Sequence, residues 1–378
     1  MAEAQQGGGP LAGVRVVELA GIGPGPFAAM LLADLGADVV RIDRPGGGAL
    51  TIDPPHDITN RGKRSVVVDL KTAEGREAAL QLVDRAHVLI EGYRPGVAER
   101  LGVGPEVCMG RNPLLVYGRM TGWGQDGPLA ERAGHDIGYI ALTGALGISG
   151  PADGPPAFPA NLLGDFAGGS LYLVVGVLAA LRHAEGGGGP GQVVDAAIVD
   201  GASHLTSILH GMLASGAWQD RREANLLDGG APFYGTYRTA DGGYMAVGAL
   251  EPAFYAEFVR LLDLEHEVPP REDLAGWGEL KRAIAERFAA RTREEWTEVF
   301  GASDACVAPV LSLTEAPEHP HLKARGTFVE RAGMVQPAPA PRFSATPAGT
   351  DGRPAEPGEH TGEVAADWQI PALLNETL

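Results

Sequence analysis

Cysteine is nearly absent, since the 378 residues include only Cys108 and Cys306. The two are far apart and form no Cys-x-x-Cys pair, which excludes a disulfide-rich scaffold and a cysteine-rich zinc module. So few cysteines suit a reducing compartment. The first ten residues also lack the basic and apolar regions of a signal peptide. We therefore expect a cytoplasmic protein.

Positive charge and long apolar runs are also scarce. The chain carries 30 Lys and Arg residues against 48 Asp and Glu residues, for a formal net charge of −18. Such a charge disfavours nonspecific contact with nucleic acid or with an anionic membrane. The longest apolar run, residues 171–181, is shorter than the roughly 18 residues that span a bilayer. We expect no nucleic-acid partner and no membrane partner, and we interpret this run as a buried helix.

Several common catalytic signatures are missing. The sequence contains no His-Glu-x-x-His, no Gly-x-Ser-x-Gly and no P-loop, which are the signatures of zinc proteolysis, serine hydrolysis and P-loop phosphoryl transfer. His319 and His321 flank Pro320, but no acidic or cysteine partner stands at ligand spacing. We therefore expect no metal.

Strand and helix patterns alternate along the first 200 residues. Short apolar strands are expected at residues 14–19, 38–42, 65–70, 87–91, 114–119 and 192–196. Helices are expected at residues 27–36, 74–86, 165 to about 185, and about 199–217. This alternation predicts an α/β fold with a large, doubly wound, Rossmann-like domain, in which helices cover both faces of a parallel sheet.

The pattern changes near Leu227, and the length of the chain favours two domains. Residues 234–239 and 244–250 flank an Ala-Asp-Gly-Gly turn, which is typical of a hairpin, and helices are expected at about 252–262 and 277–289. We expect a smaller α+β domain at about residues 226–330 and a linker helix at about 201–225. The large domain would then comprise residues 1–200 and about 331–378.

A glycine-rich turn follows the first strand. Gly21, Gly23 and Gly25 precede a helix, and Asp43 ends the next strand, as in a dinucleotide-binding site. The spacing is Gly-x-Gly-x-Gly with two prolines, however, where the fingerprint requires Gly-x-Gly-x-x-Gly. A tight strand-to-helix turn is therefore favoured over a nicotinamide site, which stays a weaker alternative.

Basic residues follow successive strands of this acidic chain. Arg44 follows the second strand, Lys71 the third and Arg94 the fourth. Ligands of doubly wound sheets bind outside the carboxyl ends of the strands, so these cations could converge on one crevice. Such a cluster suits a ligand with several phosphates. The alternative is scattered surface charge.

Three titratable residues stand in glycine-rich or turn segments, and each has two interpretations. Asp165 is a candidate acid or base, or it caps a helix that begins at Phe166. Glu251 is a candidate partner of a catalytic group, or it caps the helix that begins at Pro252. His135 is a candidate base or an ordinary loop histidine. The residues alone leave these alternatives open.

Several motifs around these residues occur together and in a consistent order. They are VVELAG at 16–21, ADLGADV at 33–39, RMTGWGQ at 119–125, GHDI at 134–137, GD at 164–165 and LDGGAP at 227–232. In these motifs the chain resembles the alpha-methylacyl-CoA racemases of the class III CoA-transferase superfamily over nearly its whole length. One departure is Gly138, which stands where a larger polar residue such as Asn is expected.

The resemblance implies the roles of particular residues. His135 and Asp165 would be the two acid-base groups, and Glu251 would orient His135. No cofactor is expected, because CoA is part of the substrate thioester. The residues implied in binding CoA are Arg44, Val68, Asp69, Leu70, Lys71, Gly92, Tyr93, Arg94, Arg100, Gly134, Asp136, Ile137, Gly138 and Tyr139.

The resemblance also implies an interlocked homodimer, with each site between the large domain of one subunit and the small domain of the other. The acyl-CoA substrate would be racemised by removing the α-proton from one face and returning a proton to the other, which requires two bases. Backbone N–H groups of a helix beginning near Asp165 are expected to stabilise the enolate. Gly168 and Gly169 would admit an acyl chain or serve helix packing.

Three other functions fit parts of the pattern. A CoA-transferase of the same fold would use Asp165 as a nucleophile and would not need His135 as a second base. A CoA-binding scaffold could keep the basic cluster and lose the three titratable residues. A nicotinamide dehydrogenase would require the flawed glycine turn to bind a dinucleotide. The sequence does not identify the acyl group.

Overall fold

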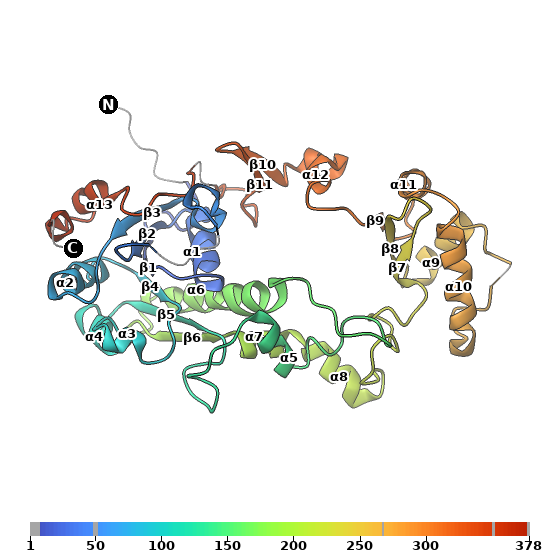
Figure 1. Cartoon of the computed structure of the whole chain (residues 1–378), viewed down its shortest axis with the longest axis horizontal. Coiled ribbons are helices and arrows are strands. Elements are labelled where there is room, and N and C mark those ends of the chain that lie inside the picture. Colours follow the sequence, from blue (N-terminus) through green and yellow to red (C-terminus); the bar gives the residue numbers. More distant parts are fainter. Residues whose placement is uncertain (1–7, 48–51, 267, 350–351, 376–378) are drawn as a thin grey trace. The chain divides into compact units, whose positions relative to one another are not determined.

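The computed structural model describes residues 8–47, 52–266, 268–349 and 352–375 (Figure 1). The described parts of the chain form two compact units. The first unit is drawn from Met1–Thr143, Pro159–Leu205 and Lys323–Leu378, and the second from Gly144–Phe158 and Thr206–Leu322.

A six-stranded parallel sheet forms the centre of the first unit. Its strands are β1 (Arg15–Leu19), β2 (Asp38–Asp43), β3 (Lys63–Val67), β4 (Val88–Glu91), β5 (Val116–Thr121) and β6 (Val193–Ala197). Their order is β3-β2-β1-β4-β5-β6, and every neighbouring pair is parallel. This is the order of a doubly wound sheet, with the switch point between β1 and β4. The predicted α/β class is therefore confirmed.

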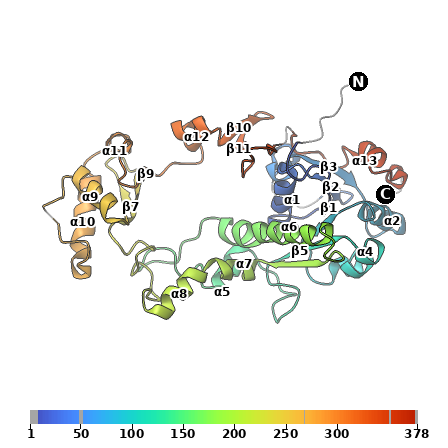
Figure 2. The same cartoon turned by 180° about the vertical axis from the view of Figure 1, so that it is seen from behind.

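Helices cover both faces of this sheet, as the alternation predicted (Figures 1 and 2). On one face, Leu32 of α1 (Pro24–Asp34) and Val177 of α6 (Leu171–Glu185) pack against Val39 and Val88. On the other face lie α2 (Ala73–Val83), α3 (Val97–Arg100), α4 (Pro105–Arg111) and α13 (Thr361–Asp367). Burial of these apolar faces supplies the main stabilisation of the unit.

The end of the third strand differs from the prediction. The apolar run continues to Leu70, but β3 ends at Val67 because its neighbour β2 ends at Asp43, the residue that pairs with Val67. The following N–H, of Val68, still donates to the Asp43 carbonyl. Pairing with the neighbouring strand, and not apolar character, fixes the strand end.

The helix expected from residue 165 begins earlier. It starts as a π-helix, η3 (Leu162–Ser170), and continues as α6, so Asp165 lies inside the helix and does not cap it. The whole stretch, Leu162–Glu185, has 24 residues and is long and apolar enough to cross a membrane by length and composition alone. The helix is thus longer than the apolar run at residues 171–181 indicated. Leu173, Val177 and Leu181 nevertheless pack in the core, and core helices pass the same test.

The helix expected at 199–217 is broken at Thr206, with φ −85° and ψ 6°, into α7 (Ile198–Leu205) and α8 (Ser207–Ser215). The remaining elements of the first unit are short. They are η1 (Pro54–His56), η2 (Ile58–Asn60), α5 (Asp136–Leu142), β10 (Phe328–Arg331), β11 (Met334–Pro337) and η6 (Pro371–Leu374). The last helix, α13, joins the core through Val364 and Trp368, whose indole donates to Asp38 Oδ2 over 2.8 Å.

The second unit is built on an antiparallel sheet. The predicted hairpin is confirmed as β7 (Tyr234–Arg238) and β8 (Tyr244–Gly248), and β9 (Val307–Pro309) adds a third strand. Aromatic side chains of helices fill its core, among them Phe258, Phe288 and Trp296. The helices are α9 (Pro252–Leu261), η4 (Leu274–Gly276), α10 (Trp277–Phe288), α11 (Arg293–Phe300) and η5 (Ala316–Glu318), and α12 (Pro320–Arg325) runs into the first unit.

Candidate active site

A cavity of about 490 Å³ lies in the first unit at the carboxyl ends of β1, β4 and β5. This is the switch point of the sheet, where doubly wound folds bind their ligands. Both Asp165 and His135 line the cavity. Its lining also includes Glu18, the turn from Gly21 to Pro26, Gly92, Tyr93, Arg94, Trp123, Gly134, Tyr139 and Asn161. The two candidate acid-base residues therefore line one open cavity.

Asp165 is held by contacts from three side chains. Its N–H donates to Asp136 Oδ1 over 2.7 Å, and its Oδ2 accepts from Asn161 Nδ2 over 3.0 Å. Its carbonyl accepts from Ser170 Oγ over 3.0 Å. Burial raises the pKa of the Asp165 carboxyl, and the charge of Asp136 adds to that effect, while the Asn161 hydrogen bond opposes it. A raised pKa makes a carboxyl group a stronger base and brings it closer to the range in which it both gives and takes a proton.

The glycines after Asp165 serve helix packing. A Cβ at Gly168 would lie 2.8 Å from the backbone N of Ala202, and one at Gly201 would lie 1.8 Å from the carbonyl oxygen of Gly168. The backbones of helix α7 and η3 are therefore in direct contact at these positions, and only glycine permits such a close approach. Of the two explanations that the sequence left open for Gly168, packing is the correct one.

His135 is held less firmly. It is the N-cap residue of α5, with extended backbone at φ −139° and ψ 167°, and its side chain is exposed. Its carbonyl accepts from the Gly138 N–H over 2.8 Å, but its imidazole makes no hydrogen bond to any residue that the structure describes. Among the described residues, hydrogen bonds to the backbone carbonyl of His135, and none to its imidazole, therefore hold this residue in place.

An aromatic pair supports the segment that carries His135. The rings of Trp123 and Tyr139 meet edge to face, with centroids 4.7 Å apart. A Cβ at Gly122 would lie 2.0 Å from Cζ of Tyr139, and one at Gly134 would lie 2.5 Å from its Cε1. Burial raises the pKa of the Tyr139 hydroxyl, which therefore stays protonated. The two glycines let the backbone pass directly against this ring.

Glu251 belongs to the second unit. It is the N-cap residue of α9, as one alternative predicted, but its carboxylate makes no capping hydrogen bond and is exposed. The Glu251 side chain is therefore available for another partner. Its contact with His135 stays a prediction.

The profile of CoA-transferase family III matches residues 11–361 of this sequence. The chain belongs to CoA-transferase family III. It is 45% identical over 361 residues to the alpha-methylacyl-CoA racemase of Mus musculus, and 45% identical over 363 residues to that of Homo sapiens. Each alignment covers 95% of this chain and 93% of the relative. The fold is similar to the crystal structure of a CaiB/BaiF family protein from Brucella suis, with a TM-score of 0.82, 29% identity, and coverage of 95% of this chain and 99% of that one.

The residues implied in CoA binding fall into two groups in this family III chain. Gly92, Tyr93, Arg94, Gly134 and Tyr139 line the cavity. The others do not line the cavity. Outside it, Arg44, Lys71, Arg100 and Ile137 are exposed, Gly138 is half-buried, and Val68 and Leu70 are buried in the core. The Asp69 side chain accepts a hydrogen bond from the Lys71 N–H, and the Asp136 side chain accepts one from the Asp165 N–H. The buried members can offer a ligand only their backbone.

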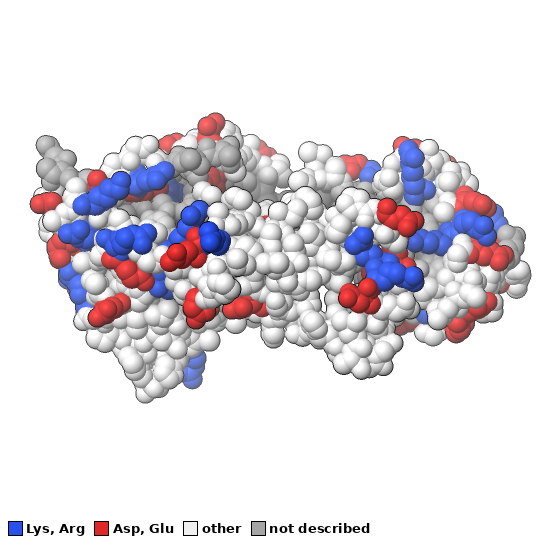
Figure 3. Space-filling model, turned by 60° about the horizontal axis from the view of Figure 1, so that its bottom comes forward, with Lys and Arg blue, Asp and Glu red and all other residues white. Residues whose placement is uncertain are grey.

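The basic residues divide by their partners. Arg61, before the third strand, and Arg64, within it, form ion pairs of 2.6 Å with Asp34 and Asp38, respectively. On the face drawn in Figure 3, basic and acidic side chains likewise lie beside one another. Arg44, Lys71 and Arg94 form no ion pair with any described residue. The scattered-charge interpretation thus fits the first group, whereas the strand-end cations are available to a phosphate ligand.

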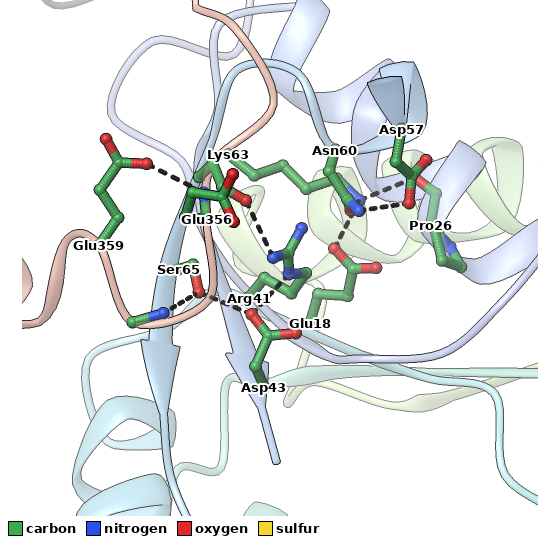
Figure 4. A network of polar contacts seen from close by, with 12 residues as sticks. Glu18, Pro26, Arg41, Asp43, Asp57, Asn60, Lys63, Ser65, Glu356 and Glu359 are labelled. Atoms are coloured by element: carbon green, nitrogen blue, oxygen red, sulfur yellow. Dashed lines mark hydrogen bonds and ion pairs between the residues drawn. The ribbon is translucent and has the colours of Figure 1, made fainter. Parts of the chain in front are cut away.

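The dinucleotide alternative is disfavoured by Asp43. In such sites, an acidic residue at the end of the second strand binds a ribose hydroxyl. Here Asp43 Oδ2 accepts from Arg41 Nε over 2.8 Å and from Ser65 Oγ over 2.6 Å (Figure 4). The carboxylate is therefore already engaged. Among the described residues, no group of three or more His, Cys, Asp and Glu side chains is arranged to hold a metal ion.

Three supports of Asp165 were not identified from the sequence. Asn161 stands four residues before it, a spacing that places two side chains on one helical face and could have been noticed. Asp136 and Ser170 gave no such signal. Asp136 contacts Asp165 across 29 residues, and Ser170 Oγ bridges Asp165 to the carbonyl of Pro24 at 2.7 Å.

Proposed function

We propose that this protein is an isomerase that interconverts (2R)- and (2S)-2-methylacyl-CoA thioesters by 1,1-proton transfer. One observation carries the proposal: a carboxyl group, Asp165, and an imidazole, His135, side chains of the kinds that act as general acids and bases, line the same cavity. The 45% identity to two alpha-methylacyl-CoA racemases over nearly the whole chain supports the same reaction.

In the proposed reaction, one base removes the α-proton and the other returns a proton to the opposite face of the carbon. When the bond between the α-carbon and its hydrogen breaks, its electron pair forms a thioester enolate. Asp165 and His135 exchange the roles of base and acid when the direction of the reaction reverses. Ionised Asp165 accepts a proton from one enantiomer, and neutral His135 accepts one from the other. Glu251 would fix the tautomer of His135 and stabilise its imidazolium form.

The enolate oxygen requires hydrogen-bond donors. The sequence favoured N–H groups of the helix near Asp165 for this role, but the N–H of Asp165 itself donates to Asp136. Gly23 and Gly25 line the same cavity, and their N–H groups make no hydrogen bond to a described residue, because N–H groups at the start of a helix have no intrahelical acceptor. We propose these two as donors to the enolate.

The CoA part of the substrate would bind along the strand ends. Arg44, Lys71, Arg94 and Arg100 carry cationic heads without ion-pair partners among the described residues, and guanidinium groups bind phosphates in bidentate geometry. Arg94 also lines the cavity, so it would link the phosphates to the reacting end.

We further propose a homodimer, with Glu251 contributed to the site of the other copy. Apolar side chains lie exposed in both units, including Leu171 and Val175 of α6 in the first unit and Ile208 of α8 in the second, and α8 buries none of its residues. A second copy would cover these faces. Both cysteines are free thiols, which is consistent with the cytoplasmic location that we propose.

The deciding test is exchange of the α-proton in deuterated water. A single enantiomer of a 2-methylacyl-CoA is incubated with the protein, and its mass and optical purity are followed together. We expect deuterium at the α-carbon and loss of optical purity without any acyl acceptor. The alternative is a CoA-transferase with Asp165 as nucleophile, which the family relationship supports. Retained α-proton and configuration, with CoA moved to an added free acid, would establish that alternative.

A further inference from the structure

One wall of the cavity is the loop between β4 and α3. Four consecutive residues of this loop, Gly92, Tyr93, Arg94 and Pro95, line the cavity. Arg94 is exposed and forms no ion pair with any described residue. Its carbonyl accepts from the Val97 N–H over 3.1 Å, so the chain turns tightly after it. The position of the Arg94 side chain therefore depends on the contacts that hold this loop.

A buried ion pair lies where the loop leaves the sheet. Glu91 is the last residue of β4 and is fully buried, and Arg119, its register partner on β5, is 7% exposed. Arg119 Nε donates to Glu91 Oε1 over 2.8 Å. Burial raises the pKa of the Glu91 carboxyl, while its hydrogen bonds and the charge of Arg119 oppose that effect. Two charges in such surroundings are costly unless further hydrogen bonds satisfy both of them.

The further hydrogen bonds of this ion pair join the two ends of the loop. The second carboxylate oxygen of Glu91, Oε2, accepts from the Tyr93 N–H over 2.7 Å. The guanidinium of Arg119 also reaches Glu99 of α3, where Nη1 donates to Oε1 over 2.8 Å and Nη2 donates to Oε2 over 3.4 Å. One arginine side chain therefore ties the end of β4 to the helix that follows the loop.

We propose that Arg119 is a positioning residue, which holds the loop so that Arg94 points at the phosphates of CoA. The inference rests on the proposed function, since it requires CoA at the strand ends. Arg119 is buried, and its Nε, Nη1 and Nη2 all donate to carboxylates, so its guanidinium is engaged away from the ligand. A guanidinium whose loop is fixed before the ligand arrives loses less conformational entropy when it binds a phosphate. Arg119 thereby strengthens CoA binding through Arg94.

A double-mutant cycle with CoA itself as the ligand tests the proposal. In the unaltered protein, Arg94→Met should raise the Kd of CoA about 10-fold or more, because a charge-assisted contact to phosphate is lost. In Arg119→Lys, the lysine keeps a positive charge beside Glu91 but lacks the planar fork that reaches both Glu91 and Glu99. Arg94 is then no longer held in place. We expect Arg94→Met to raise the Kd of Arg119→Lys only about 2- to 3-fold.

The readout is the factor by which Arg94→Met raises the Kd, measured by calorimetric titration. A merely structural role of Arg119 would leave this factor unchanged, and such additivity would overturn the proposal. A Kd that Arg94→Met does not alter would overturn it as well, because Arg94 would then not bind CoA. Glu99→Gln weakens the other end of the loop without disturbing the buried pair, since the Glu99 side chain is 44% exposed. This variant should also reduce the factor, and it should fold even if Arg119→Lys does not.

Arg111→Lys is the matched control. Arg111 also joins two carboxylates, with Nε donating to Asp84 Oδ1 over 2.9 Å and Nη1 donating to Glu77 Oε2 over 2.8 Å, but none of these residues lines the cavity. In this variant the factor of Arg94→Met should be the same as in the unaltered protein. The cycle measures binding without turnover, so its result is separate from that of deuterium exchange with a 2-methylacyl-CoA, which reports the proposed function.

Discussion

Asp165 and His135 line one cavity, yet their surroundings differ. Asp165 lies inside a π-helix, is half-buried, and is contacted at its N–H, its carbonyl and its carboxylate by three different side chains. Phe166 beside it stacks on Phe27, with ring centroids 4.4 Å apart. His135 is exposed at the start of a short helix, and no described side chain contacts its imidazole through a hydrogen bond.

This difference separates the two halves of the proposed mechanism. The first unit alone fixes the position and the pKa of Asp165, because every group that holds it belongs to that unit. The imidazole of His135 lacks such support and needs a further group, which we propose to be Glu251. π-Helical turns are frequent at functional sites. In this protein the π-helix η3 carries Asp165, the base that is held by more hydrogen bonds.

Replacing either base should have the largest effect, and the two variants should fail differently. We expect Asp165→Asn and His135→Asn each to lose about 10²- to 10⁴-fold in racemisation. The remaining base can still remove and return a proton on its own face. Each variant should therefore exchange deuterium into one enantiomer only, with retained configuration, measured by mass and chiral analysis.

Two exposed residues of the first unit serve as controls for this comparison. Asp84→Asn and His183→Asn make the same chemical changes outside the cavity and should keep racemisation. If Asp165→Asn and His135→Asn exchanged the same enantiomer, the two-base assignment would be wrong.

The next largest effect should come from the aromatic support of His135. A methyl group at Gly122 would meet the Tyr139 ring at 2.0 Å, so Gly122→Ala must displace the ring and should lower stability by about 1–3 kcal/mol. Gly138→Ala, in α5, meets nothing within 4 Å and should raise stability by about 0.5–1 kcal/mol. Denaturant unfolding of both variants measures the difference. Equal stability of the two would show that the ring is not a rigid support.

The sequence predicted the sheet well, because alternating apolar runs and helical periods are local signals. The sequence-based prediction was wrong where contact with another element sets the end of a strand or helix. The apolar run of the third strand continues beyond Val67, but β2 ends and pairing stops there. The helix around Asp165 begins at Leu162, so Asp165 lies inside its π-helical turns. No residue composition is typical of a π-helical turn, so the sequence does not predict this start.

The candidate site was predictable to the same extent. His135, Asp165 and Arg94 stand in recognisable segments, and all three line the cavity. The groups that hold them are tertiary partners. The bond from Asp165 to Asp136 and the pair of Lys63 with Glu18 join different elements of the fold, so no spacing along the chain reveals them.

A smaller effect is expected from Ser170. Its hydroxyl links the Asp165 carbonyl to that of Pro24, and Ser170→Ala removes this link while it leaves Asp165 itself in place. We expect a loss of about 1 kcal/mol in stability and a fall in kcat larger than any change in KM. Ser215→Ala, which removes a similar bond to the Met212 carbonyl in α8, should lower stability without changing kcat. A parallel fall of kcat in both variants would assign Ser170 a general structural role.

The smallest effect, and the most specific to Asp165, should follow from Asn161→Ala. The Asn161 amide donates to the ionised carboxylate and so lowers its pKa against the effect of burial. Without this bond the pKa of Asp165 rises further, and a higher pH is needed to ionise it. When Asp165 acts as the base, the acidic limb of the kcat/KM profile should therefore move to higher pH. Because two enantiomers have equal free energy, the ratio of their kcat/KM values is fixed at every pH, and the acidic limb should move equally for both. Measuring the pH profile in Asn161→Ala tests this, and an acidic limb that stays in place would contradict the role of the Asn161 hydrogen bond in lowering the pKa of Asp165.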